Sequence, residues 1–335
     1  MISDPAALAV YAAFGLLYGI VLQRSGFCFA RAALELFLLR SRDALNGVLA
    51  GLAAGTIGFA AVTAVRAHLG LTTSDHLLVL PLGLGTFIGA AMFGLGMSLA
   101  GMCIVGSLLR LGEGYLIGAL ALLGAVVGAA LDPFRAVLGR SALLPNLLGT
   151  PVSGASVADW LGLPGAVLLT LAALALVARV GNPRSRRPSL RLQLTPAVIG
   201  GVLLAALNTA QMAWHQPWTV AYPLGVVATA ASGTAGFSLH HAMPLLTLDL
   251  GVVLGAAGSA LAARDLRLRW PRQRGQVALS LGGGVLMGWG VQLAHGCNIG
   301  GLLSALPSLS LSAWLFLPGL FAGAWLGSLI LRRVS

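Results

Sequence analysis

Charged residues make up only 9% of this 335-residue chain, whereas a water-soluble domain carries about 25%. The chain has too few charged side chains to cover its surface against water, so we predict an integral membrane protein. Lysine is absent: the 20 basic residues are all arginines, set against 9 acidic residues. The apolar runs do not alternate with polar residues, which excludes a transmembrane β-barrel.

Motifs for nucleotides, metals and disulfides are also missing. No GxxxxGK[ST] segment is present, so coupling to ATP would require another subunit. The three cysteines, Cys28, Cys103 and Cys297, are far apart and form no CxxC pair, which argues against a disulfide framework or a structural zinc site. We therefore expect no cofactor. The N-terminus lacks a basic region and a cleavage site, so we expect its first apolar run to be retained as a helix.

Long apolar runs predict an all-α polytopic fold. Runs long enough to cross a bilayer lie near residues 5–22, 44–65, 78–100, 115–131, 163–179, 243–263, 276–294 and 311–331. Residues 195–232 contain two further apolar stretches, separated by WHQPW at 214–218, where proline and interfacial aromatics predict a break. Four segments that open with glycine are too short to cross, and we expect re-entrant helices there: 26–39, 101–110, 236–242 and 296–306.

These short segments are related in pairs. A shift of 194 residues places GLGMSLAGMCIVGSLL (94–109) on GWGVQLAHGCNIGGLL (288–303), with 8 of 16 positions identical and Cys103 on Cys297. A shift of 210 places SGFC (25–28) on AGFS (235–238), with serine in place of the thiol. We therefore predict one transmembrane transport domain that contains an N-terminal repeat (1–135), a linking region (136–214) and a C-terminal repeat (215–335).

The arginines lie beside the apolar runs. Fourteen of the 20 fall within 24–42, 179–191 and 264–274, a positive-inside pattern with contacts to anionic lipids rather than a nucleic-acid surface. If all three segments face the cytoplasm, the N-terminus is periplasmic, the C-terminus is cytoplasmic and the chain crosses about nine times. The two halves are then inverted, and broken helices from both halves meet near the midplane, as in many transporters.

Short helices that begin inside the membrane would supply the chemistry. Their first backbone N–H groups are unpaired and attract an anion without a buried lysine or arginine. Glycine lets the backbone turn and approach a solute closely, and a thiol is a soft, polarisable group that suits a sulfur or selenium solute. The candidate solute-binding and relay residues are Cys28, Cys103, Cys297, Gly26, Gly101, Gly106, Gly296, Asn298 and Gly300.

A few charged or titratable residues lie beside these segments. Arg110 could guide an anion or simply pair with Glu113 at a helix end. His240 and His241 could attract an anion near the periplasmic face, although histidines are common at membrane interfaces. A zinc site built from these two histidines and His295 would lack a fourth ligand, so we expect no metal.

Three segments resemble the signature segments of the YeeE/YedE family of sulfur transport: QRSGFCFA (23–30), GMCIVGSLLRLGEG (101–114) and HGCNIGG (295–301). The resemblance implies a bacterial inner-membrane protein with an hourglass-shaped inverted repeat that takes up thiosulfate. It also implies that three cysteines pass the anion inward through S–H···S contacts, with Cys297 toward the periplasm, Cys103 near the constriction and Cys28 toward the cytoplasm. A cytoplasmic sulfurtransferase is the partner that this resemblance suggests.

The sequence therefore favours a transporter for thiosulfate or a close relative, and not an enzyme. Three alternatives stay open: a selenium-compound transporter of the same family, a membrane thiol oxidoreductase, and a channel for a neutral solute or a hard anion. A redox role requires two thiols in disulfide geometry, and no two cysteines are close in sequence. The few acidic residues within the apolar runs offer no obvious proton relay.

Overall fold

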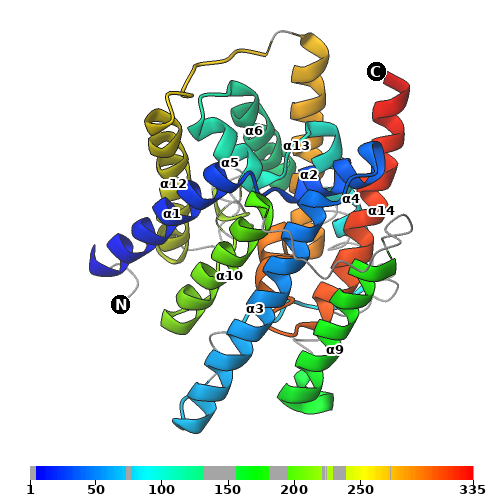
Figure 1. Cartoon of the computed structure of the whole chain (residues 1–335). Coiled ribbons are helices and arrows are strands. Elements are labelled where there is room, and N and C mark those ends of the chain that lie inside the picture. Colours follow the sequence, from blue (N-terminus) through cyan, green and yellow to red (C-terminus); the bar gives the residue numbers. More distant parts are fainter. Residues whose placement is uncertain are drawn as a thin grey trace.

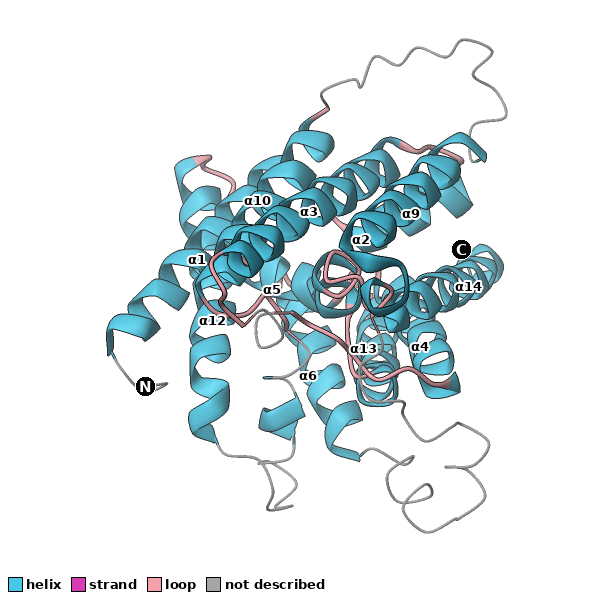
Figure 2. Cartoon of the chain, turned by 90° about the horizontal axis from the view of Figure 1, so that it is seen from below, coloured by secondary structure: helices cyan, strands magenta, loops and turns pink. Residues whose placement is uncertain are grey.

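The computed structural model describes residues 5–72, 77–131, 156–180, 195–220, 223, 225–228, 239–271 and 273–334. Within these ranges the chain forms helices and no strand (Figures 1 and 2). The long helices are α1 (Pro5–Ser25), α3 (Asp43–His68), α4 (Leu84–Ala100), α6 (Leu116–Leu131), α9 (Ala158–Val180), α10 (Pro196–Trp214), α12 (Leu239–Ala262), α13 (Arg274–Ala294) and α14 (Leu311–Val334). The short elements are α2 (Phe29–Leu34), α5 (Ile104–Gly112) and two π-helices, η1 (Glu35–Leu39) and η3 (Asn298–Ser304).

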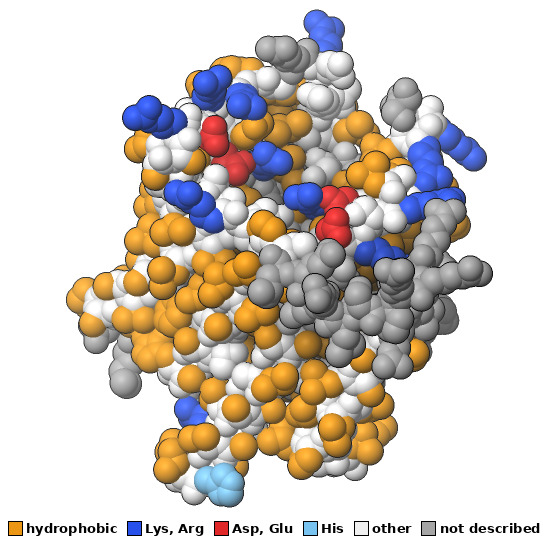
Figure 3. Space-filling model, viewed as in Figure 1, with side chains coloured by type: hydrophobic (Ala, Val, Ile, Leu, Met, Phe, Trp, Pro, Cys, Tyr) orange, Lys and Arg blue, Asp and Glu red, His pale blue; other side chains and the backbone are white. Residues whose placement is uncertain are grey.

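The helices have the length and surface of a multi-pass membrane protein. Eight helical stretches of the described chain are long and apolar enough to cross a membrane, and α6 is a shorter apolar helix. Leucines such as Leu168 and Leu254 are 68% and 55% exposed on their outer faces, and orange side chains cover the middle of the molecule in Figure 3. The predicted all-α polytopic fold is confirmed. The number of crossings and the inverted repeat stay predictions.

Two of the predicted segments differ from the structure. Residues 78–83 are not helical, and α4 begins only at Leu84, because the backbone N–H groups of Leu78 and Leu80 donate to the hydroxyls of Ser308 and Ser310. The predicted short segment 236–242 is not separate: residues 239–242 begin α12, and 236–238 lie outside the described residues. Pro244 does not end α12, since a proline near the start of a helix removes few hydrogen bonds.

The long helices form two groups around the short elements. In one group α1 packs on α12 and α10, and α10 packs on α3. In the other, α4 packs on α13 and α14, and α13 packs on α6. Contacts from α5 to α6 and α12, and from η3 to α3 and α14, place these short helices between the groups. Figure 2 shows α2 and α5 in this central position.

Glycines bring the helix backbones unusually close. A Cβ on Gly96 of α4 would lie 2.4 Å from the carbonyl oxygen of Gly283 on α13. A Cβ on Gly290 of α13 would lie 2.6 Å from the carbonyl oxygen of Gly89 on α4. Small residues allow such approach in membranes, where van der Waals packing holds helices together. The α4–α13 contact therefore joins backbone to backbone along its length.

Charged side chains gather at one end of the molecule. Arg332, near the C-terminus, donates to the carbonyl of Phe37, and Arg269 donates to the hydroxyl of Tyr115. These bonds bring segments 24–42 and 264–274 to the end that is uppermost in Figures 1 and 3, where the C-terminus also lies. The arginines of 181–191 lie outside the described residues. Segments 24–42 and 264–274 thus lie at the same end of the molecule, as the positive-inside distribution of arginines predicts. Which compartment this end faces stays a prediction.

Candidate functional site

The three cysteines share one local structure. Each is the N-cap of a short helix, with extended backbone: Cys28 precedes α2, Cys103 precedes α5 and Cys297 precedes η3. Two residues before each cysteine the backbone is left-handed, with φ of 62° at Gly26, 71° at Gly101 and 56° at His295. A left-handed residue commonly ends a helix. The long helix therefore stops, and the thiol is set at the start of the short helix that follows.

The structure brings Cys28 and Cys103 together around a glycine. A Cβ on Gly106 would lie 3.7 Å from the Sγ atom of Cys103 and 3.9 Å from that of Cys28. The N–H group of Gly106 also donates to the Sγ atom of Cys103 at 3.4 Å. Both thiols are free, and both line a cavity of about 10 Å³ together with Ile299 of η3. Residues from both predicted halves therefore meet at one small cavity.

Cys297, two residues before Ile299 in the chain, does not line this cavity and is 2% exposed. Gly300, which the 194-residue repeat pairs with Gly106, faces a hydroxyl: its Cβ would lie 3.1 Å from the Oγ1 atom of Thr219. Thr219 thus has the position relative to Gly300 that Cys28 has relative to Gly106. Sequence comparison missed Thr219, because a shift of 191 places QPWT (216–219) on SGFC (25–28) without one identical residue.

The other predicted residues have more varied surroundings. The amide nitrogen of Asn298 donates to the Sδ atom of Met97 at 3.1 Å, while its Oδ1 atom has no partner in the described structure. Gly101 is exposed, and a Cβ there would meet nothing within 4 Å. A Cβ on Gly296 would lie 3.1 Å from the side chain of Leu80. The amide nitrogen of Asn298 is therefore already bound to the protein, whereas its oxygen is available to a solute. Gly101 has free space beside its Cα atom.

Arg110 lies at the charged end of the molecule and not at the cavity. It forms an ion pair of 3.1 Å with Glu113 and lies over the ring of Tyr115, 4.9 Å from its centroid. The pairing that the sequence allowed is thus present, and anion guidance by Arg110 stays a prediction. The side chains of His240 and His241 lie outside the described part of the structure.

Several buried polar atoms near Cys297 lack hydrogen-bond partners among the described residues: Tyr18 Oη, Trp218 Nε1 and Asp249 Oδ1. The rings of Tyr18 and Trp218 stack with centroids 4.2 Å apart, and the indole of Trp218 lies beside the carboxyl group of Asp249. Tyr18 carries no distinctive sequence signal, and Trp218, which the sequence places among interfacial aromatics, is fully buried. Asp249 does carry one, because an acid inside an apolar run of membrane-spanning length marks a functional position.

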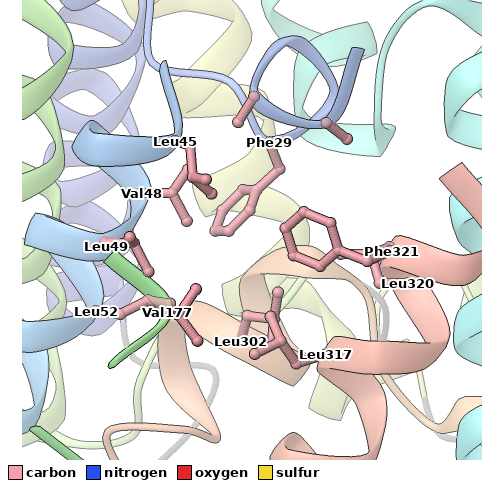
Figure 4. Close-up of a pocket in the computed structure, with 12 residues that line it drawn as sticks. Phe29, Leu45, Val48, Leu49, Leu52, Val177, Leu302, Leu317, Leu320 and Phe321 are labelled. Carbon is pink, nitrogen blue, oxygen red and sulfur yellow. The ribbon is translucent and has the colours of Figure 1, made fainter. Parts of the chain in front are cut away.

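A larger cavity shares Phe29 with the thiol cavity and has no chemistry for an anion. Its volume is about 30 Å³, and side chains from α2, α3, α9, α14 and η3 enclose it. Figure 4 shows Phe29, Leu302 and Phe321 pointing into it. All of its lining residues are apolar, so a charged solute there would lose its hydration without compensation.

The polytopic fold, with three free thiols at the starts of short helices, is that of a membrane transport protein. The profile of the sulphur transport family matches residues 24–326, and the chain belongs to this family. The resemblance to YeeE/YedE proteins is therefore confirmed.

Two curated relatives are similar to the chain over almost its whole length. Thiosulfate transporter TsuA of Spirochaeta thermophila is 32% identical over 335 residues, covering 95% of this chain and 97% of the relative. Thiosulfate transporter TsuA of Escherichia coli is 28% identical over 339 residues, covering 94% of this chain and 92% of the relative. Probable transporter YedE of Salmonella typhimurium is 36% identical over 89 residues, 25% of this chain and 22% of the relative.

Proposed function

We propose that this protein takes up thiosulfate, or a closely related sulfur anion, across the bacterial inner membrane, without enzymatic activity. The observation that carries the proposal is the pair of free thiols, Cys28 and Cys103, that faces one small cavity around Gly106. The two full-length relatives named as thiosulfate transporters support the same substrate. The charged end is the cytoplasmic side, where anionic lipids and a soluble sulfurtransferase are the partners we expect.

The anion moves from Cys297 past Cys103 to Cys28. Polarisable sulfur atoms contact the terminal sulfur of thiosulfate, and backbone N–H groups at the starts of the short helices contact its oxygen atoms. No covalent bond forms or breaks in this passage. The cavity of about 10 Å³ between the thiols holds about one water molecule, so the passage must widen when an anion enters.

We infer that the two halves are inverted. α5 leads toward the charged end, where Tyr115 contacts Arg269, whereas η3 leads toward Ser308, which binds Leu78 in the segment that follows α3. The packing of α1 on α12 is mirrored by that of α10 on α3, and the packing of α4 on α14 by that of α13 on α6. This pairing favours a second repeat that begins at α10 rather than at residue 215.

Growth tests the function directly. A bacterial strain without thiosulfate uptake is expected to grow on thiosulfate as its sole sulfur source, and to accumulate labelled thiosulfate, when it expresses this chain. The strain with an empty vector is the control. If the chain inserts normally yet supports neither growth nor uptake, the proposal is wrong. Uptake of selenite in place of thiosulfate would favour the selenium alternative.

Thr219 tests the mirrored site around Gly300. We expect Thr219→Val to raise the KM for thiosulfate about tenfold, because a hydrogen bond to a charged group contributes about 1.5–3 kcal/mol. Thr219→Ser, which keeps the hydroxyl, should transport normally. Thr170→Val on α9 is the matched control, since the Thr170 hydroxyl donates to the carbonyl of Ala166 away from the site. An unchanged KM in Thr219→Val would mean that this hydroxyl does not contact the anion.

A further inference from the structure

One carboxyl group of the described chain lies in the middle of a membrane-crossing helix. Asp249 is near the centre of α12 and is 9% exposed. Its Oδ1 atom has no hydrogen-bond partner among the described residues. The other acidic residues that the structure describes lie at or next to the ends of helices: Glu35, Asp43, Glu113, Asp159 and Asp265. The position of Asp249 is therefore exceptional within the described chain.

The surroundings of Asp249 include an indole, a thiol and no cation. The indole of Trp218 lies beside the carboxyl group, and its Nε1 atom makes no hydrogen bond to a described residue. The carboxyl group of Asp249 also lies near the thiol of Cys297. The acid therefore lies within electrostatic reach of the position at which we propose that the anion enters.

The elements packed against α12 bring few other titratable groups. α12 contacts α1 and α5. α1 carries Tyr11 and Tyr18 on its buried face, and at its end Arg24, which donates to Ser259, ten residues along α12 from Asp249. α5 carries Arg110, which pairs with Glu113. Among the described residues, no arginine forms an ion pair with Asp249. A charged carboxylate here is thus unpaired, and an unpaired charge inside a membrane protein is strongly disfavoured.

We propose that Asp249 carries a proton inward with the anion, so that the proton gradient drives uptake; this inference rests on the proposed thiosulfate uptake. The carboxylate binds one proton from the side where the anion enters and releases it on the other side. No bond within the anion changes. A proton requires one oxygen lone pair, whereas a metal cation such as Ca²⁺ requires several oxygen ligands, and the neighbours Trp218 and Cys297 offer none from their side chains.

Coupling to protons would overcome the membrane potential, which opposes the entry of a doubly charged anion. A membrane potential of about 100 mV, negative inside, excludes a doubly charged anion from the cell by about a thousandfold at equilibrium. Each proton that travels with the anion cancels one of its two charges. Each unit of pH difference adds about a further tenfold of accumulation per proton.

The test uses the purified full-length protein in liposomes with labelled thiosulfate. An inward proton gradient, with the outside more acidic by one unit, is expected to raise accumulation by the native protein about tenfold. Asp249→Asn should lose this response but still exchange internal for external thiosulfate, because the anion path is intact. Asp249→Glu, which can still bind a proton, should keep the response. Asp265→Asn is the matched control, because Asp265 is exposed beyond the end of α12.

A second measurement does not depend on the variants. Thiosulfate added outside liposomes of the native protein should acidify an entrapped pH dye as protons enter. The proposal is overturned if the dye does not respond, if Asp249→Asn keeps the full pH response, or if a sodium gradient drives uptake and a proton gradient does not. If the native protein carries no thiosulfate under any gradient, the proposed function fails and this inference fails with it.

Discussion

Cys297→Ala is expected to abolish thiosulfate uptake, and Cys297→Ser to retain about 1% or less of it. The Cys297 thiol is buried at the start of η3, where its sulfur would make the first contact with the entering anion. Loss of about 3 kcal/mol from a charge-assisted contact corresponds to about a hundredfold. Serine keeps a hydrogen-bond donor but loses the size and polarisability of sulfur. Uptake of labelled thiosulfate by cells with equal amounts of inserted protein measures the effect.

The serine variant separates chemistry from folding. A hydroxyl already lies beside η3, at Thr219, so this region accommodates small polar side chains. Gel filtration in detergent should therefore give the same profile for Cys297→Ser as for the native chain. Full transport by the serine variant would show that the thiol acts only as a hydrogen-bond donor.

Gly106 is the second sensitive position. Gly106→Ala is expected to reduce uptake at least about tenfold, and Gly106→Leu to reduce it below detection, with normal membrane insertion of the alanine variant. The nearest atom to an added Cβ is the Cβ of Met102 at 3.3 Å, and the sulfur atoms of Cys28 and Cys103 follow. A methyl group therefore fits the fold but fills the space between the two thiols.

A matched control exists within α12. Gly258→Ala adds the same methyl group to a membrane-spanning helix, and nothing lies within 4 Å of the added atom. Its uptake should equal that of the native chain. If Gly106→Leu inserts normally and transports thiosulfate with unchanged KM, the anion does not pass between Cys28 and Cys103.

Most helices could be predicted from the sequence, because a membrane-spanning helix has a length set by the bilayer and an apolar composition. The ends that were wrong depend on contacts between distant segments. The leucine-rich composition of residues 78–83 predicts a helix, but hydrogen bonds to the hydroxyls of Ser308 and Ser310 keep this segment from forming one. Such bonds join residues that are far apart in the chain, and no local pattern reveals them.

In the candidate site, too, some residues could be predicted from the sequence and others depend on contacts between distant segments. The repeat identified Gly106 and Gly300 as equivalent, since both follow a cysteine after a small-residue turn, and both glycines face a thiol or hydroxyl in the structure. The partner of Gly300 is Thr219, which shares no identity with the segment around Cys28. The proposed role of Thr219 requires only a polar atom beside Gly300. Packing can therefore keep that atom in place although the sequence around it shares no identity with the segment around Cys28.

The backbone contact between α4 and α13 limits how the molecule can open. With the carbonyls of Gly89 and Gly283 close against the facing helix, the two helices cannot slide or tilt past one another without losing contacts along their length. α4 belongs to the predicted N-terminal repeat and α13 to the predicted C-terminal repeat, so large rocking of one repeat against the other, a usual form of alternating access, would break this contact. We therefore expect the two repeats to stay fixed relative to one another while gating is confined to the short helices, with displacements of side-chain size and correspondingly fast turnover.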